Sequence, residues 1–306
     1  MAAADPPTAT ATGPRPLVTV GIPFFNNAAT LADAVRSVFA QTLADWELIL
    51  ADDGSADGSL AVARSVSDPR VCVLSDGVNR GLVYRLNQIS NAARGKYVAR
   101  MDADDLADPR RLRLQVERLE RTPDVDVVDA ALYSVDDALR PTGKRGLTPL
   151  RCDLPSVLRS GMLLHATILG RVEWFLRNPY LPGYGRAEDY ELWARTCAAS
   201  RFARVAEPLY FYRESYGVSV RNYLGSSRGE RKVLRQYGPA ALGRAGTWRL
   251  MARSYAKGAA YVLLGAAGLQ HVLARRRSEA LTEEEARRAE EVIAAVRATE
   301  VPGLAG

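Results

Sequence analysis

The chain has few of the residues that most often hold metal ions or cross-link small domains. Among its 306 residues there are two histidines and three cysteines, Cys72, Cys152 and Cys197, with no CxxC pair. This excludes a disulfide scaffold and argues against a structural zinc site. Free thiols are typical of a reducing compartment, so we expect a cytoplasmic protein. We expect any metal ion on carboxylates rather than on imidazoles.

Long apolar runs are missing as well. The longest candidate, Gly258–Gln270, has thirteen residues, which is short of the roughly 18 to 20 needed to span a bilayer. The first sixteen residues are rich in Ala, Thr and Pro and lack the apolar core of a signal peptide, so residues 1–15 are predicted to be a disordered leader. No GxGxxG follows a predicted strand, which disfavours a dehydrogenase.

Positive charge is concentrated in one part of the chain. The formal net charge is +6, yet residues 226–278 hold eleven Lys and Arg against the single acid Glu230. The remainder is therefore net acidic, and we expect no nucleic-acid partner. We predict that residues 226–306 form a basic, helical C-terminal region.

The first two thirds of the chain alternate between apolar strand patterns and helical patterns. This alternation predicts an α/β domain over residues 16–225, with a mostly parallel, Rossmann-like sheet and helices on both faces. Ligands in such sheets bind beyond the carboxyl ends of the strands. The predicted strands are 17–22, 46–51, 71–74, 97–101, 126–133 and 163–169, and the predicted helices are 31–39, 59–66, 82–93 and 109–119, with a loop over 140–155.

Acidic residues follow two of these strands. In the Asp102-Ala103-Asp104 sequence, an extended backbone points both carboxylates to one side. Neighbouring anions repel unless a cation lies between them, and Mg²⁺ or Mn²⁺ suits such oxygen ligands. The alternative is a solvated acidic turn before the next helix. Asp53, in the sequence Asp52-Asp53-Gly54, could likewise be a turn residue or could accept a hydrogen bond from a nucleobase or ribose.

Two further positions could carry chemistry. Asp189 could act as a general base delivered by a loop whose Gly183 and Gly185 permit movement. The alternative for Glu188 and Asp189 is a favourable interaction with the N-terminal end of a helix dipole. His165 could be a packed strand residue, or it could contact an acceptor or a metal.

These motifs occur in a recognisable order. The sequence resembles the family 2 glycosyltransferases of the GT-A fold, and the resemblance extends from about Pro16 to Tyr212. It is carried by five segments: Val18–Asn26 (VTVGIPFFN), Glu47–Ser55 (ELILADDGS), Asn79-Arg80-Gly81, Gly95–Asp105 (GKYVARMDADD) and Glu188–Trp193 (EDYELW).

The resemblance implies a donor site for a nucleotide-diphosphate sugar. Pro23, Phe24 and Phe25 would line the nucleotide pocket, and Asp53 would contact the base. Arg80 lies where a contact to the base or a phosphate is expected.

The resemblance also implies a reaction. Asp102 would lie near the ribose or the metal, Asp104 would hold Mn²⁺ or Mg²⁺ at the diphosphate, and Asp189 would deprotonate the acceptor hydroxyl. This predicts metal-dependent, inverting transfer of a sugar to a glycan or glycolipid acceptor in cell-surface synthesis. Arg100 stands where the family often has an apolar residue.

Several alternatives accompany this interpretation. The QxxRW signature of processive synthases is absent, since Gln236 is followed by Tyr-Gly-Pro, so we expect transfer of one sugar per encounter. A sugar-1-phosphate nucleotidylyltransferase is the nearest enzyme alternative, although the first strand runs into Pro23 rather than into a glycine-rich phosphate loop. A non-catalytic protein that binds nucleotide sugar or membrane is the alternative from another class.

The C-terminal region is predicted to contain two helices. Trp248–Ala274 reads as one helix with basic flanks, which suits either an anionic membrane surface and a peripheral location, or packing on the catalytic domain. Thr282 and Glu285 form a capping-box pattern that opens a last amphipathic helix. That helix is expected to pack on the core or on a second subunit in a homodimer.

Overall fold

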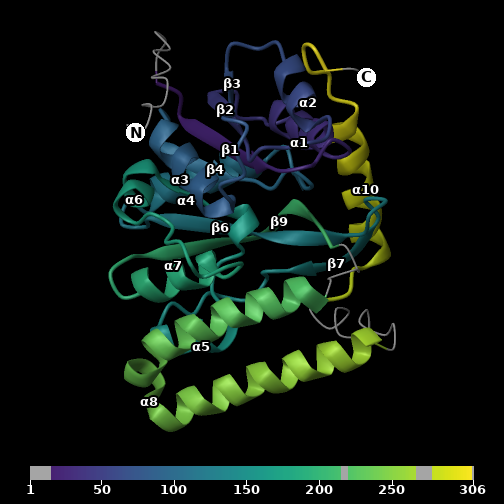
Figure 1. The fold of residues 1–306 in the computed structure, drawn as a ribbon. Coiled ribbons are helices and arrows are strands. Elements are labelled where there is room, and N and C mark those ends of the chain that lie inside the picture. Colours follow the sequence, from purple (N-terminus) through teal and green to yellow (C-terminus); the bar gives the residue numbers. More distant parts are fainter. Residues whose placement is uncertain (1–14, 215–219, 267–277, 305–306) are drawn as a thin grey trace.

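The computed structural model describes residues 15–214, 220–266 and 278–304, so the predicted leader lies almost wholly outside the described residues. Nine strands form one sheet in the order β3-β2-β1-β4-β8-β6-β9-β5, with β7 paired to β6 (Figure 1). The strands are β1 Val18–Phe24, β2 Trp46–Asp52, β3 Val71–Leu74, β4 Tyr97–Arg100, β5 Leu106–Ala107, β6 Val127–Val135, β7 Pro141–Arg145, β8 Leu169–Arg171 and β9 Phe202–Arg213.

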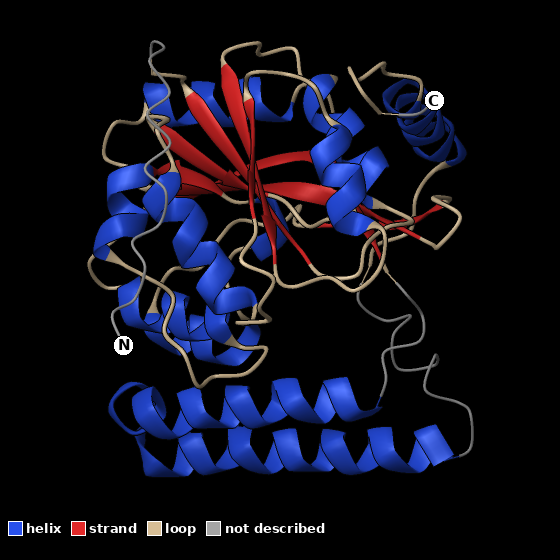
Figure 2. Ribbon diagram, turned by 45° about the horizontal axis from the view of Figure 1, so that its top comes forward, coloured by secondary structure: helices blue, strands red, loops and turns tan. Residues whose placement is uncertain are grey.

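Helices cover both faces of this sheet, as Figure 2 shows. The apolar residues of α1, α2 and α4 share one core cluster with β1 and β2, whereas α3, α5, α6 and α7 contribute to a second cluster on the other face. The helices are α1 Leu31–Phe39, α2 Ser59–Ser65, α3 Leu82–Ala92, α4 Arg111–Arg121, α5 Leu154–Ser160, α6 Val172–Arg177, α7 Glu188–Thr196, α8 Val220–Ala266 and α10 Glu283–Arg297.

The parallel part of the sheet agrees with the sequence prediction. Strands β3, β2, β1 and β4 are all parallel, because the helix between each consecutive pair of them returns the chain to the same edge. Gly21 in the middle of β1 lets α3 lie close, since a Cβ there would come within 2.3 Å of Ile89 Cγ2. The strands beyond β4 are mixed in direction: β8 is antiparallel to β4 and β6, while β6 and β9 are parallel.

The middle of the chain corrects two sequence predictions. The predicted strand over 163–169 is instead a 3₁₀ turn, His165–Thr167, followed by the short strand β8. The predicted loop over 140–155 contains strand β7 and the start of α5. Single-sequence periodicity fails here because both elements are too short to repeat a pattern.

Helix α8 begins well before the predicted start at Trp248. It folds back on itself at Gly243, where φ is +68° and the helix is interrupted, so the predicted boundary at 225/226 falls inside its first arm. The two arms lie side by side in Figures 1 and 2. Tyr223 of the first arm stacks on Tyr261 of the second at 3.6 Å between ring centroids. The predicted continuation to Ala274 lies partly outside the described residues.

Helix α10 packs on the catalytic core, as one of the two sequence alternatives predicted. Its capping box is present, with Thr282 and Glu285 bonding reciprocally. Ala289, Ile293 and Val296 are buried in a third apolar cluster with β5 and β9. Beyond the helix, the main chain of Pro302 accepts a hydrogen bond from Ser67, which ties the C-terminal segment to the first half of the sheet.

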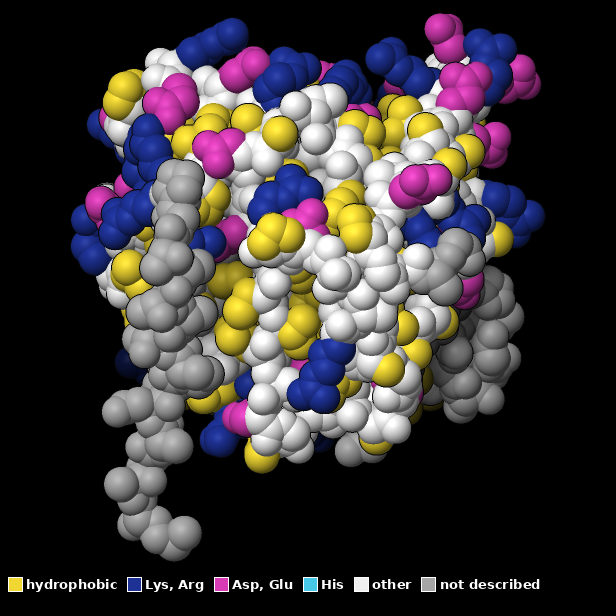
Figure 3. All heavy atoms as spheres, turned by 90° about the horizontal axis from the view of Figure 1, so that it is seen from above, with side chains coloured by type: hydrophobic (Ala, Val, Ile, Leu, Met, Phe, Trp, Pro, Cys, Tyr) yellow, Lys and Arg dark blue, Asp and Glu magenta, His cyan; other side chains and the backbone are white. Residues whose placement is uncertain are grey.

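None of the described helices combines the length and the apolar character needed to cross a membrane. On the face drawn in Figure 3, basic and acidic side chains are interspersed.

Candidate functional site

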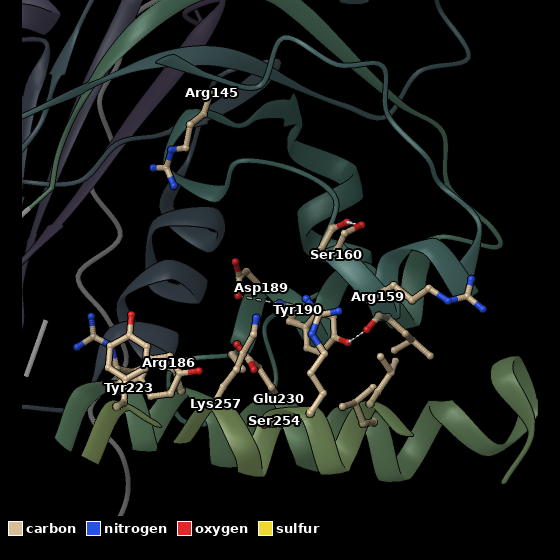
Figure 4. A pocket seen from close by; sticks show the side chains of 18 of the residues that line it. Arg145, Arg159, Ser160, Arg186, Asp189, Tyr190, Tyr223, Glu230, Ser254 and Lys257 are labelled. Atoms are coloured by element: carbon tan, nitrogen blue, oxygen red, sulfur yellow. Dashed lines mark hydrogen bonds between the residues drawn. The ribbon is translucent and has the colours of Figure 1, made fainter. Parts of the chain in front are cut away.

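A cavity of about 990 Å³ lies between the sheet and the two arms of α8. Asp104 and Asp189 both line it, although they are far apart in the sequence. Every lining residue comes from Asp104 or later in the chain. Asp189 and Tyr190 lie centrally in Figure 4, with α8 forming the wall below them.

Three carboxylates gather beside this cavity, and one of them, Asp104, lines it. Asp102, Asp104 and Asp105 each place one carboxylate oxygen within 4.8 Å of the others. Burial raises the pKa of Asp104, and repulsion from Asp102 adds to the effect. For Asp105, burial and then the charges of Asp104 and Asp102 raise the pKa well above its ordinary value. Oδ2 of Asp105 is buried without a hydrogen-bond partner. An orphaned carboxylate oxygen beside two others fits a hard divalent cation such as Mg²⁺ or Mn²⁺.

Strand β9 holds the turn over residues 102–105, called the acidic turn below, through hydrogen bonds. The main-chain nitrogen of Arg213 donates to Oδ1 of Asp105 at 2.7 Å, and Nε of Arg213 donates to the carbonyl of Asp104 at 2.9 Å. The main-chain nitrogen of Asp102 donates to the hydroxyl of Tyr210 at 3.0 Å. Sequence analysis missed Arg213 and Tyr210, because they lie more than a hundred residues downstream and belong to no local motif.

Arg100 lies between the acidic turn and the start of α7. Its side chain is 9% exposed and donates from Nη2 to Oδ1 of Asp102 at 2.5 Å. Burial alone would lower the pKa of Arg100, but Asp102 and other anionic groups hold it above its ordinary value. The same guanidinium opposes the pKa rise of Asp104 and of Asp189. The buried Arg100 therefore limits the pKa of a carboxyl in the acidic turn, Asp104, and of one in α7, Asp189.

Glu188 and Asp189 form the first turn of α7. Burial raises the pKa of both carboxyls, and the neighbouring charge of Asp189 contributes to bringing that of Glu188 to about 7. Oδ1 of Asp189 accepts a hydrogen bond from the main-chain nitrogen of Tyr190 at 2.7 Å. Asp189 also lines the cavity.

The loop that precedes α7 is held by the first arm of α8. The hydroxyl of Tyr184 donates to Gln236 at 2.7 Å, and Nζ of Lys232 donates to the carbonyl of Gly183 at 3.0 Å. Gly229 lets the helix touch this loop, since a Cβ there would meet the carbonyl oxygen of Tyr184. The first arm of α8 therefore holds the loop that leads to Asp189, the residue predicted to be the base.

His165 belongs to a buried aromatic group. Its Nε2 and the hydroxyl of Tyr180 are 2.8 Å apart, and its ring packs edge-on against Trp193. Burial, and then the charge of Arg100, hold the pKa of His165 well below its ordinary value. A neutral, packed histidine agrees with the first of its two sequence alternatives, although not on a strand.

The residues predicted to contact the nucleotide lie outside this cavity. Asp53 accepts hydrogen bonds from the main-chain nitrogens of Arg80 and Gly81 at 2.8 and 3.0 Å, and from Nε of Arg85 at 3.0 Å. The guanidinium of Arg80 pairs with Asp76 at 2.6 Å and lies over the ring of Tyr84. Asp53 thus fixes the segment that carries Arg80, and Arg85 is a buried partner that sequence analysis missed.

The aromatic pair after Pro23 divides between two environments. Phe24 is 2% exposed and packs in the core with α1, whereas Phe25 is 46% exposed. Phe24 is the last residue of β1, and Phe25 lies in the bend that follows the strand. The structure therefore corrects the prediction for Phe24, which is a core residue. Pro23 is buried too, and Phe25 is the exposed residue among the three predicted to line the nucleotide pocket.

The sequence and the fold have counterparts in known proteins. The sequence pattern of the family described as "Glycosyl transferase family 2" matches residues 19–177, just over half of the chain. The chain belongs to glycosyl transferase family 2. This glycosyltransferase assignment replaces both the nucleotidylyltransferase and the non-catalytic alternative.

Two curated relatives agree with the assignment to glycosyl transferase family 2. The glycosyltransferase is 34% identical over 218 residues to the putative glycosyltransferase EpsE of Bacillus subtilis, a match that covers 66% of this chain and 74% of EpsE. It is 26% identical over 178 residues to an Escherichia coli protein, WfgD, which is named a UDP-Glc:alpha-D-GlcNAc-diphosphoundecaprenol beta-1,3-glucosyltransferase. That match covers 58% of this chain and 68% of WfgD.

Solved structures confirm the GT-A fold. Residues 1–349 of S. aureus TarS in complex with UDP-GlcNAc align with a TM-score of 0.59 and 17% identity, over 78% of this chain and 71% of that one. The mannosyltransferase PcManGT from Pyrobaculum calidifontis, in complex with GDP-Man and Mn²⁺, aligns with a TM-score of 0.56 and 20% identity, over 92% of this chain and 85% of that one.

Proposed function

We propose that this glycosyltransferase transfers one sugar from a nucleotide-diphosphate sugar to the hydroxyl of a glycan or glycolipid acceptor, with a divalent cation and with inversion at the anomeric carbon. The observation that carries the proposal is that Asp104 and Asp189 line one cavity, with the unpartnered buried Oδ2 of Asp105 next to Asp104. An acidic cation site and a base facing the same space are the two parts that such a transfer needs.

Asp102, Asp104 and Asp105 would hold the cation, either Mn²⁺ or Mg²⁺. When bound, it would offset the negative charge that develops on the departing diphosphate. Arg213 and Tyr210 keep the turn in place through its main chain, so the carboxylate oxygens stay directed at the ligand. Asp53 would support the nucleotide side by holding Arg80 and Gly81, while Pro23 and Phe25 would border the base.

Asp189 would accept the proton of the acceptor hydroxyl on Oδ2. As the oxygen of the acceptor hydroxyl forms a bond to the anomeric carbon, the bond from that carbon to the diphosphate breaks and the nucleoside diphosphate leaves. A base and a leaving group on opposite faces of the sugar require inversion. General-base assistance of this kind is typically worth about 10²- to 10⁴-fold in rate.

The names of two relatives and the basic charge of α8 support a place for this reaction in the cell. WfgD, by its name, acts on a diphosphoundecaprenol-linked acceptor, and ExoO is named a succinoglycan biosynthesis protein. Together with the basic second arm of α8, this supports a role in cell-surface glycan synthesis at the cytoplasmic face of a membrane. The absence of the QxxRW signature supports transfer of a single sugar per encounter.

The test uses the full chain, Mn²⁺ and a set of UDP-, GDP- and dTDP-sugars in a thermal-shift assay. We expect one nucleotide class to stabilise the protein in Mn²⁺ but not in EDTA. Asp104→Asn should lose this metal-dependent shift. Asp189→Asn should keep it, yet slow transfer about a hundredfold or more. Stabilisation by none of the nucleotides, or Asp189→Asn turnover close to that of the native protein, would contradict the proposal.

A further inference from the structure

The cavity is far more basic at its α8 wall than the proposed chemistry requires. Four cationic side chains line this half: Arg159 from the end of α5, Arg186 from the loop before α7, and Arg253 and Lys257 from the second arm of α8. They come from three separate elements of the fold. Figure 4 shows Lys257 on α8 below Asp189 and Arg186 to the left, with the side chain of Arg159 extending to the right, away from Asp189.

These cations are poorly balanced by the protein itself. Within residues 15–214, 220–266 and 278–304, Arg159, Arg253 and Lys257 take part in no ion pair or side-chain hydrogen bond. Glu230 is the one acid that lines this half of the cavity among the described residues. Arg253 and Lys257 are four residues apart and so share one face of the helix, where like charges repel. All four cations are exposed to water, so their charged groups are available to an anion that enters the cavity.

The position of the group separates it from the donor side. The residues that hold the predicted nucleotide segment, Asp53 and Arg85, do not line the cavity, and its only contribution from the N-terminal half of the sheet is Asp104. Asp189 lines the same cavity as the four cations. A molecule that offers its hydroxyl to Asp189 would extend over these cations.

Resting on the proposed function, we infer that the acceptor bears a phosphate or diphosphate, and that Arg159, Arg186, Arg253 and Lys257 bind it. The volume of about 990 Å³ is at the upper end of ligand pockets, which leaves room for an acceptor sugar together with its anionic group. Apolar residues beside the cations, Leu234, Leu250 and Tyr261, continue the wall and would border whatever the phosphate carries.

Inorganic pyrophosphate is the probe, titrated into the full chain by calorimetry with EDTA present, so that a metal-bound donor site does not contribute. Arg253→Gln combined with Lys257→Gln should weaken its binding roughly tenfold or more, because a charge-assisted hydrogen bond to the anion is stronger than a neutral one. The matched control is Arg244→Gln combined with Arg249→Gln. It removes the same charge from exposed positions of the same arm that do not line the cavity, and should bind within about twofold of the native protein.

Farnesyl diphosphate in a parallel titration identifies the source of the anion. Tighter binding than inorganic pyrophosphate, abolished in the Arg253/Lys257 variant, supports a lipid-linked acceptor. Equal binding with the same weakening supports recognition of the phosphate alone. Equal weakening in both double variants, or full displacement of pyrophosphate by UDP or GDP with Mn²⁺, would overturn the inference, since the anion would then be bound non-specifically or at the donor site.

Nucleotide binding in the same preparations keeps the two proposals apart. If Mn²⁺ and a nucleoside diphosphate stabilise the native protein and both double variants alike, the donor site stands. A lining variant that then keeps native pyrophosphate affinity overturns the acceptor inference alone. If no nucleotide binds to the native protein, the proposed function itself fails.

Discussion

Arg100 and Asp102 form an ion pair at 2.5 Å, with the arginine almost fully buried and the aspartate one quarter exposed. The pair explains why a cation stands where the family often has an apolar residue. Three carboxylates close together repel one another, and a fixed guanidinium relieves part of this repulsion whether or not a metal ion is bound. Nε of Arg100 is buried without a partner, so the group faces the site with unused donor capacity.

Replacing this arginine should make the protein depend more on metal. In EDTA, Arg100→Met should lower the free energy of unfolding by about 2 kcal/mol, less than for a fully buried pair, because Asp102 is partly solvated. Mn²⁺ should then raise the melting temperature of the variant more than that of the native protein. Arg113→Met, at an exposed pair, is the control. Equal Mn²⁺-induced shifts in the variant and the native protein would show that Arg100 does not balance the carboxylates.

The rate of transfer should fall at mildly acidic pH. Burial raises the pKa of Asp189, and Arg100 opposes this rise. A general base must be deprotonated, so activity is lost as pH falls through this raised value, at a higher pH than for an ordinary carboxyl. In Arg100→Met the acidic limb of the profile of kcat against pH should move to still higher pH. An unchanged acidic limb would show that the charge of Arg100 does not affect the pKa of Asp189.

Glu188 should make folding stability depend on pH in the opposite sense from a salt-bridged acid. Its pKa in the folded state is about 7, against 4.5 for an ordinary glutamate. The folded protein therefore binds this proton more tightly than the unfolded chain, and stability rises as pH falls from about 8 to about 5. Glu188→Gln should remove this dependence and stabilise the protein at pH 8, on the order of 3 kcal/mol by urea unfolding. The exposed Glu290→Gln should change neither, and a Glu188→Gln variant with the native pH dependence would refute the assignment.

The outer surface of α8 should bind anionic membranes. Trp248 and Leu263 are 68% and 72% exposed on the second arm, which also carries Arg249. Exposed apolar side chains beside basic ones are typical of interfacial helices. Trp248→Ser combined with Leu263→Ser should reduce sedimentation with phosphatidylglycerol vesicles roughly fivefold. Leu176→Ser, at an exposed leucine on α6, should leave it unchanged. Equal sedimentation of the native and the doubly substituted protein would leave α8 with the packing role alone.

Local patterns predicted the parallel half of the sheet well. Strands β1 to β4 and helices α1 to α3 are confirmed within one or two residues, because each has an apolar period long enough to read. The short elements around His165 were misassigned, since a three-residue turn carries no period. The predicted single helix at Trp248 is the second arm of a hairpin, because its first arm is too polar to show a continuous apolar face.

Neighbours along the chain were enough to predict the fold class, the family and the acids at the strand ends, since each of these is a local pattern. Which side chains share a space came from the folded molecule alone. It placed Asp104 and Asp189 on one cavity, showed Asp53 hydrogen-bonded to Arg80, Gly81 and Arg85, and brought Arg213 against the main chain of Asp104. It also closed the cavity with α8. Contacts between segments a hundred residues apart arise from how sheet and helices pack together, and no local pattern in the sequence records them.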